Sequence, residues 1–284
     1  MLTANVSLET DELPLNQEDV TYFHSVRHWI YDHTGLYYPE RKYSTLYHRL
    51  QKLCHELNIP NLEVLDKHLK EGDLPSLSVQ VACAVSTNHT YFFREEETMN
   101  FFREQIVPNL PADEQWRIWS AASSSGDEAY SLALILTEKL GIAEAIQKAT
   151  ILGTDISHTV LKQAESGICS EQRLDKIPLE LRQKYFRRAG PEKWAINAEI
   201  KQICTFRRLN LMSTPWPFQQ NFHVIFCRNV LYYFDRHKQK SLVDRLYQIT
   251  TPGGWLITSV TESLWNLKSR WQVVKTGIYR KGFG

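Results

Sequence analysis

The chain has 284 residues and a mass of 33.2 kDa, and its 43% hydrophobic and 23% charged residues exclude bulk disorder. Its 33 basic and 32 acidic residues give a net charge of +1, so no global field attracts it to nucleic acid or to a membrane. The five cysteines include no Cys-x-x-Cys pair, which indicates neither a zinc site nor a disulfide framework and favours a reducing cytoplasm. No signal peptide and no membrane-spanning segment are expected, because the first residues lack a basic flank with an apolar run and no long apolar stretch follows.

The charge is distributed unevenly along the chain. Residues 1–86 carry 7 Lys and Arg against 12 Asp and Glu, a net charge of −5. Residues 87–284 carry the remaining 26 and 20, a net charge of +6. This shift predicts a domain boundary near residue 86.

Apolar residues recur at helical spacing in the first part, 1–86. The first predicted helix begins after its cap, Asn16, and ends at Gly35. Three further helices are predicted at 41–57, 61–72 and 76–85. The second helix carries leucines on one side and a basic stripe beside them, formed by Arg41, Lys42, Arg49 and Lys52. No strand pattern is visible, so we expect an all-helical domain.

Strands alternate with helices in the second part. The predicted strands cover 116–121, 150–154, 222–227 and 255–260, with helices at 127–140, 159–166 and 238–249. A turn is predicted at 252–254, a small insertion of strands and turns at about 185–206, and a final edge strand within 271–280. This alternation predicts an α/β fold, with a mostly parallel sheet and helices on both faces.

Polar side chains follow three of these strands, at the edge where open parallel sheets bind ligands. Small residues at 122–126 lead into a helix that carries Glu128, Asp155 ends the second strand, and Arg228-Asn229 follow the third. These residues also have ordinary structural explanations. The small residues could form only a tight turn, Glu128 could be a favourable charge near the helix dipole, and Asp155 could cap the helix that follows it. Taken together they favour a nucleoside ligand, and the absence of Gly-x-Gly-x-x-Gly favours one without phosphates, S-adenosylmethionine.

Several longer segments occur together in one order. They read Thr-Asn-His-Thr-Tyr-Phe-Phe-Arg-Glu at 87–95, Ser-Ser-Gly-Asp-Glu-Ala-Tyr-Ser-Leu at 124–132, Gly-Thr-Asp-Ile-Ser at 153–157, Ile-Phe-Cys-Arg-Asn-Val-Leu-Tyr-Tyr-Phe-Asp at 225–235, Pro-Gly-Gly at 252–254 and Thr-Glu-Ser-Leu at 261–264. In these segments the chain resembles the CheR-type chemotaxis receptor methyltransferases over residues 20 to 280. Members of that family are protein-glutamate O-methyltransferases that use S-adenosylmethionine and release S-adenosylhomocysteine.

The resemblance implies a role for individual residues. It implies an N-terminal helical domain at 1–86, a segment at 87–112 that closes over the cofactor, and a methyltransferase domain at 113–284 with the strand insertion. It assigns cofactor binding to Asn88, Thr90, Arg94, Glu128, Asp155, Asn210, Leu211, Arg228 and Asn229. Arg94 and Tyr233 would flank the transferred methyl group, although packing is an equal alternative for Tyr233. The stripe Arg41, Lys42, Arg49 and Lys52 would dock on the cytoplasmic helical region of a chemoreceptor, although a solvated face is the ordinary explanation.

Some residues depart from the family pattern. Ala122 stands in place of a glycine, Asp127 in place of a glutamate, and Ser259 begins a segment where the family has Gly-x-Ser-Glu. If position 122 needs a positive φ or a close approach to the cofactor, its methyl group would weaken binding. The alternative function is therefore a degenerate module that binds S-adenosylmethionine or receptors without catalysis.

Other possibilities have less support in the sequence. A methyltransferase that modifies nucleic-acid amino groups would want an Asn-Pro-Pro-Tyr-like strand end, which Cys-Arg-Asn-Val at 227–230 is not. His24 and His28 lie one helical turn apart, but no third ligand is apparent, so no metal is expected. We expect a monomer, and we expect that the strand insertion does not bind a receptor C-terminal peptide.

Overall fold

The computed structural model describes residues 17–74, 76–87 and 89–283, and the chain divides after Ser86 into two compact units. Unit 1 is all-helical, as predicted, and its helices are α1 (Gln17–Thr34), α2 (Tyr43–Glu56), α3 (Leu62–Glu71) and α4 (Leu77–Val85), with a 3₁₀ turn η1 (Glu40–Lys42). Asn16, the predicted cap of the first helix, lies outside the described residues. The second helix begins later than predicted, because the first two residues of the basic stripe lie in η1.

The core of unit 1 is formed by the apolar faces of its helices. Phe23, Val26 and Ile30 of α1 and Leu46 and Leu50 of α2 are completely buried in one cluster. The ends of α3 follow the sequence signals, since the Asn61 side chain accepts a hydrogen bond from Val64 N and Gly72 closes the helix at φ 66°.

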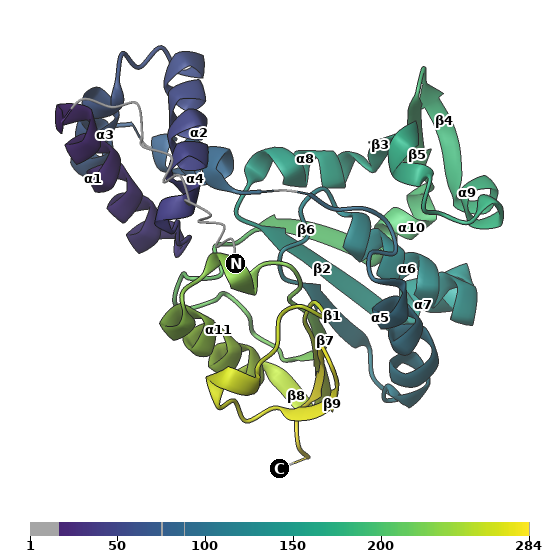
Figure 1. Cartoon of the computed structure of the whole chain (residues 1–284). Coiled ribbons are helices and arrows are strands. Elements are labelled where there is room, and N and C mark those ends of the chain that lie inside the picture. Colours follow the sequence, from purple (N-terminus) through teal and green to yellow (C-terminus); the bar gives the residue numbers. More distant parts are fainter. Residues whose placement is uncertain (1–16, 75, 88, 284) are drawn as a thin grey trace, which may run out of the picture. The chain divides into compact units, whose positions relative to one another are not determined.

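Unit 2 is built around a seven-stranded sheet with the order β6-β2-β1-β7-β8-β10-β9 (Figure 1). Its strands are β1 (Trp116–Ser120), β2 (Ala149–Asp155), β6 (Cys204–Arg208), β7 (Phe222–Phe226), β8 (Thr250–Ile257), β9 (Gln272–Lys275) and β10 (Ile278–Arg280). Strands β6, β2, β1, β7 and β8 pair in parallel, and β10 and β9 extend the sheet antiparallel. The predicted α/β class is confirmed.

Helices cover both faces of this sheet. Figure 1 shows α6 (Asp127–Leu140), α7 (Ile142–Lys148) and α10 (Ala198–Ile203) on one side and α11 (Arg236–Gln248) on the other. Helix α5 (Glu96–Phe101) continues as a π-helical turn η2 (Phe102–Ile106) and a 3₁₀ turn η3 (Val107–Asn109). The remaining helices are α8 (His158–Ser166) and α9 (Leu179–Tyr185), and the remaining 3₁₀ turns are η4 (Glu171–Leu174), η5 (Leu231–Tyr233) and η6 (Trp265–Leu267). The sheet interior holds large apolar side chains such as Ile118, Trp119 and Phe226, each fully buried.

A second, three-stranded sheet is inserted between β2 and β6. It pairs β3 (Ile168–Ser170), β5 (Lys193–Ile196) and β4 (Phe186–Gly190), all antiparallel. The predicted insertion at 185–206 is therefore wrong at both ends. It begins earlier, at β3, and residues 204–206 belong to β6 of the main sheet.

The predicted turn at 252–254 lies inside β8. The three residues Phe222 to Val224 of β7 face the six residues Thr250 to Trp255, so the extra residues form a bulge in β8. Gly254 is required there, because a Cβ on it would lie 2.6 Å from a Thr250 side-chain carbon and 2.9 Å from the His223 carbonyl oxygen.

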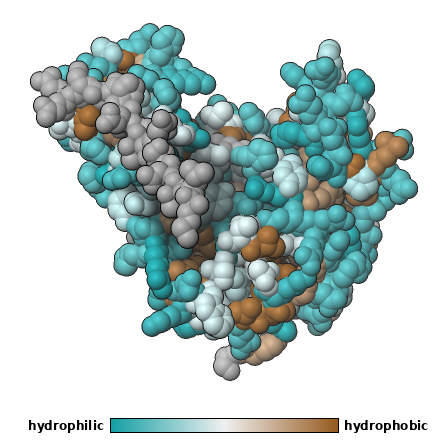
Figure 2. All heavy atoms as spheres, in the orientation of Figure 1, coloured by the Kyte–Doolittle hydropathy of each residue, from teal (hydrophilic) through white to brown (hydrophobic). Residues whose placement is uncertain are grey.

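The surface in Figure 2 is mainly hydrophilic, with hydrophobic side chains in small groups. Among the described residues, no helix combines the length and the hydropathy needed to cross a membrane.

Candidate active site at the carboxyl edge of the sheet

The loop after β1 is a tight turn against the end of β2. Ser123 N donates to the carbonyl oxygen of Thr154 (2.8 Å), and Ser124 N donates to Asp155 Oδ2 (2.9 Å). The left-handed positions in this turn are Ser124, at φ 48°, and Gly126, at φ 88°, where a Cβ would lie 2.9 Å from that of Ala164. Ala122 is not among the positive-φ residues, so its methyl group causes no backbone strain.

Asp155 ties this turn to the next loop. Asp155 is only 8% exposed, and its Oδ1 accepts a hydrogen bond from Ser157 N (2.9 Å) while Oδ2 accepts from Ser124 N. Burial raises the pKa of Asp155, against the opposing effect of these backbone hydrogen bonds. Each oxygen keeps a second lone pair, so structural bonding and a ligand hydroxyl can share the carboxylate.

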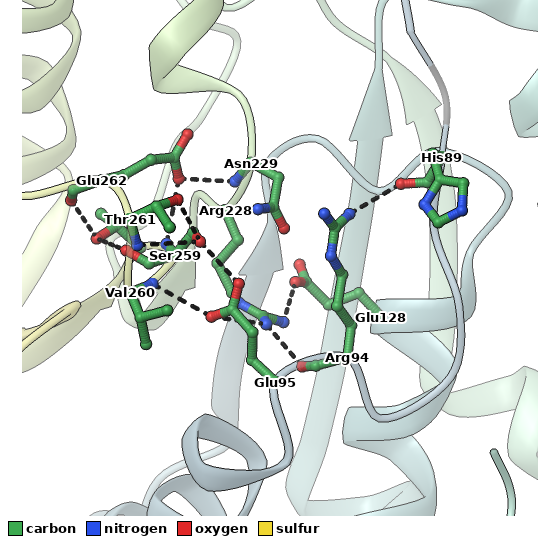
Figure 3. Close-up of polar contacts among 11 residues, drawn as sticks. His89, Arg94, Glu95, Glu128, Arg228, Asn229, Ser259, Val260, Thr261 and Glu262 are labelled. Carbon is green, nitrogen blue, oxygen red and sulfur yellow. Dashed lines mark hydrogen bonds and ion pairs between the residues drawn. The ribbon is translucent and has the colours of Figure 1, made fainter.

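A buried arginine joins the carboxyl ends of β7 and β1. The Arg228 side chain is 1% exposed, and its Nη1 donates to Glu128 Oε2 (2.9 Å), at the start of α6. Its Nη2 lies 3.2 Å from Glu95 Oε2 and donates to the carbonyl oxygen of Arg94 (2.6 Å). Glu128 also accepts from Ser120 Oγ (2.7 Å). Two predicted cofactor residues, Glu128 and Arg228, are thus brought together as an ion pair (Figure 3).

Glu95 connects this arginine to the loop after β8. Its Oε1 accepts from Ser259 Oγ (2.7 Å) and its Oε2 accepts from Val260 N (3.3 Å). Burial raises the pKa of Glu95, but the Arg228 charge and these hydrogen bonds outweigh burial and hold it below its ordinary value. Glu95 is therefore ionised at neutral pH.

Glu262 holds the loop that carries the predicted residue Asn229. Glu262 is 6% exposed, and its carboxylate accepts hydrogen bonds from Asn229 N (2.7 Å), Leu231 N (2.9 Å) and Ser259 N (3.1 Å). Asn229 has a positive φ of 57°, and these bonds stabilise that conformation. Burial raises the pKa of Glu262, although the backbone donors oppose the shift.

The predicted catalytic residues lie on two segments at this edge. The Arg94 Nη1 donates to the carbonyl oxygen of His89 (2.8 Å), and its guanidinium carbon lies 5.7 Å from the centre of the Tyr91 ring. Tyr233 lies in η5 with its ring 4.4 Å from that of Tyr232, whose hydroxyl donates to the Tyr233 hydroxyl at 3.4 Å. Burial raises the pKa of Tyr232, and the Arg94 charge opposes this shift.

The other predicted cofactor residues occupy neighbouring segments. Asn210 and Leu211 follow β6, next to the end of β2, where Leu209 N donates to the carbonyl oxygen of Asp155 (3.0 Å). Asn210 Oδ1 accepts from Met212 N (2.9 Å). Thr90 is half-buried in the segment before α5, and Asn88 lies outside the described residues.

Sequence reasoning missed Glu95 and Glu262 as members of this site. Both stood inside the segments that carry the family resemblance, which was the available signal. Their roles depend on contacts between distant residues, such as the bond from Ser259 to Glu95 across 164 positions, and no local pattern announces such a contact.

The predicted docking residues lie in unit 1. Arg41 is exposed in η1, and the Lys52 side chain is 79% exposed with its Nζ 3.8 Å from Glu56 Oε1. Arg49 differs, because its Nη1 donates to the carbonyl oxygens of Val85 (2.7 Å) and Ser86 (3.2 Å). Arg49 therefore also stabilises the C-terminus of α4.

The residues at the carboxyl edge fit S-adenosylmethionine by their chemistry. The buried Asp155, the partly buried Glu128 and the Asn229 amide suit hydroxyl and ammonium groups. The Ser123 hydroxyl is buried without a hydrogen-bond partner among the described residues. No glycine-rich phosphate loop accompanies them. Asp155 suits the ribose by its place at the end of β2.

Comparisons with known proteins agree with this assignment. The family model described as "CheR methyltransferase, SAM binding domain" matches residues 88–280, and "CheR methyltransferase, all-alpha domain" matches residues 22–78. The "Chemotaxis protein methyltransferase" of Borreliella burgdorferi is 32% identical over 241 residues, which cover 83% of this chain and 85% of that protein. The "Chemotaxis protein methyltransferase 2" of Pseudomonas aeruginosa is 33% identical over 245 residues, 85% of this chain and 86% of that protein. This chain therefore belongs to the CheR family of S-adenosylmethionine-dependent methyltransferases.

Proposed function

We propose that this enzyme transfers the methyl group of S-adenosylmethionine to glutamate side chains of a chemoreceptor-like signalling protein, forming glutamate methyl esters. The names of its relatives support a chemotaxis substrate. The family match and the intact carboxyl edge favour catalysis over the degenerate binding module.

The observation that carries the proposal is the bonding of the Arg94 guanidinium. Among the described residues no carboxylate forms an ion pair with its guanidinium, whereas nearby Glu95 and Glu128 are both bound to Arg228. The acids that could neutralise Arg94 are thus held elsewhere by a buried cation. An arginine left in this state can bind a carboxylate supplied by a substrate.

The chemistry of a carboxylate acceptor suits the side chains present. When bound, S-adenosylmethionine supplies a methyl group on a positively charged sulfur. A glutamate is ionised at neutral pH, so the protein needs no general base and Arg94 has only to orient the acceptor. Burial raises the pKa of the Cys227 thiol well above its ordinary value, so this strand-end cysteine is not a competing nucleophile. Orientation of this kind contributes up to roughly 7–11 kcal/mol in the best-aligned cases.

The individual site residues remain part of the proposal. We assign cofactor binding to Asn88, Thr90, Arg94, Glu128, Asp155, Asn210, Leu211, Arg228 and Asn229, and flanking of the transferred methyl group to Arg94 and Tyr233. We assign receptor docking to the stripe Arg41, Lys42, Arg49 and Lys52. The exposure of Arg41 and Lys52 supports docking, and Arg49 combines it with the bonds that it makes to the end of α4.

The test is methyl transfer to a purified cytoplasmic fragment of a methyl-accepting chemoreceptor, measured as methanol released by base. We expect Arg94→Ala to lower kcat by about 100-fold, because the acceptor loses its orienting cation. The affinity for S-adenosylhomocysteine, measured by calorimetry, should fall by less than about tenfold.

Arg103→Ala is the matched control, since Arg103 lies in η2 and, among the residues that the structure describes, donates to Asn100 Oδ1 (2.7 Å), three positions before it. Its kcat should stay within about twofold of the wild type. An unchanged kcat in Arg94→Ala would remove Arg94 from the mechanism, and no transfer by the wild type would contradict the proposed function.

A further inference from the structure

Arg94 lies between two residues in the left-handed region. Phe93 has φ 55° and Glu95 has φ 58°, and neither is a glycine. Side chains with a Cβ seldom adopt this conformation, and they keep it only where surrounding contacts impose it. The contacts around Glu95 therefore bear directly on where Arg94 is held.

Three bonds fix the backbone on both sides of Arg94. Phe93 N donates to Ser131 Oγ (2.9 Å), on α6. The carbonyl oxygen of Arg94 accepts from Arg228 Nη2 (2.6 Å), and the same nitrogen lies 3.2 Å from Glu95 Oε2. Arg228 thus binds the main chain of one residue and the side chain of the next.

The carboxylate of Glu95 points away from Arg94. Figure 3 shows it directed to Arg228 and the 259–260 turn, while the Arg94 guanidinium extends toward His89. Hydrogen bonds from Ser259 Oγ (2.7 Å) and Val260 N (3.3 Å) hold it in that direction. An adjacent acid that could neutralise Arg94 is instead engaged elsewhere.

We propose that Glu95 is a positioning residue: by pairing with Arg228, Ser259 and Val260 it fixes the strained backbone next to Arg94 and leaves the Arg94 guanidinium available to the acceptor carboxylate. This inference rests on the proposed function of Arg94. It assigns Glu95 no contact with cofactor or substrate, so its effect on the reaction passes through Arg94.

A double-mutant cycle tests this dependence. Methyl transfer to the receptor fragment is measured for the wild type, Glu95→Gln, Arg94→Lys and the double variant, under single-turnover conditions so that slow variants stay measurable. Glu95→Gln alone should lower the rate by about tenfold, because the amide cannot pair with Arg228 as the carboxylate does. In the Arg94→Lys background the same change should cost less than about twofold, since the group that Glu95 positions is already lost.

Glu96→Gln is the matched control, with the same chemical change at the next residue. Glu96 is exposed in the first turn of α5, so its variant should keep the wild-type rate. Affinity for S-adenosylhomocysteine should change by less than about threefold in Glu95→Gln, which separates positioning from loss of the cofactor site.

Hydrogen exchange gives a readout that needs no turnover. In Glu95→Gln, amides of the peptide covering 90–99 should exchange faster than in the wild type, while those of α6 beyond Ser131 should be unchanged.

Equal costs of Glu95→Gln in both backgrounds, or unchanged exchange over 90–99, would overturn the inference. A wild type that transfers no methyl group would contradict the proposed function instead, so the two failures are distinguishable.

Discussion

At the scale of single residues, positions 122 and 126 in the turn after β1 have different backbone requirements, which the sequence alone does not reveal. Gly126 has a positive φ, as Ser124 does, and a Cβ on Gly126 would also meet Ala164, whereas Ala122 has no positive φ. The substitution of alanine for the family glycine at 122 is thus compatible with the observed backbone.

A pair of substitutions tests this difference. Gly126→Ala should lower the free energy of unfolding by about 1–3 kcal/mol, because it adds strain and a clash. Ala122→Gly should change it by less than about 1 kcal/mol and should change affinity for S-adenosylhomocysteine by less than about threefold. Denaturant titration and calorimetry measure the two quantities. A tenfold gain in affinity for Ala122→Gly would show that the methyl group obstructs the cofactor.

At the scale of elements, one buried histidine links the starts of β1 and β7. His223 Nδ1 accepts from Arg117 N (3.0 Å), and Nε2 donates to Glu114 Oε2 (3.0 Å), so the ring serves as a neutral acceptor and donor. Burial lowers the pKa of His223 below 6.5, in spite of the opposing Glu114 charge. Protonation would remove the acceptor for Arg117 N.

This linkage predicts a pH dependence of stability. Below about pH 6.5 the unfolded chain binds a proton that the folded protein does not, so the free energy of unfolding falls as the pH falls from 6.5 toward the lower folded pKa. The loss is about 1.4 kcal/mol for each unit by which the pKa is lowered. His223→Gln should lack this component. When the free energy of unfolding is plotted against pH for the wild type and the variant, the difference between them should shrink from pH 7 to pH 5. Parallel curves would contradict the neutral state of His223.

The elements were predictable where they are local and strongly apolar. The alternation from β1 to α8 and the helices of unit 1 follow from side-chain periodicity and caps, such as Asn61 and Gly72 around α3. Strand β6 was misplaced because only Phe206 among its residues is buried, so its apolar signal is weak. The bulge in β8 was read as a turn, because Pro-Gly-Gly is a turn signal whose place inside a strand depends on the pairing partner.

The site was predictable at the strand ends but not beyond them. Glu128, Asp155 and Asn229 follow from their places after strands, because such ends meet at one edge of a parallel sheet. The pairing of Arg228 with Glu95, and the bonds from Glu262 to the Asn229 loop, join distant segments and became visible only in three dimensions.

At the scale of the whole molecule, the two units differ in kind and in charge. Unit 1 is helical with a net charge of −5 and carries the basic stripe, of which Arg41 and Lys52 are exposed. Unit 2 holds the sheet and the candidate active site with a net charge of +6. We propose that the first serves recognition and the second serves chemistry. Rim charges of this kind mainly affect the rate of encounter, so high salt should slow docking more than the methyl-transfer step.

The most direct test of the central claim is to identify the modified side chain. The full chain is incubated with S-adenosylmethionine and a chemoreceptor cytoplasmic fragment, and peptides of the fragment are analysed by mass spectrometry before and after mild alkali. The account predicts the added mass of one CH₂ group on glutamate residues, lost on treatment with base as an ester requires. Methylation that resists base, on a lysine or arginine, or the absence of any methylated peptide, would contradict it.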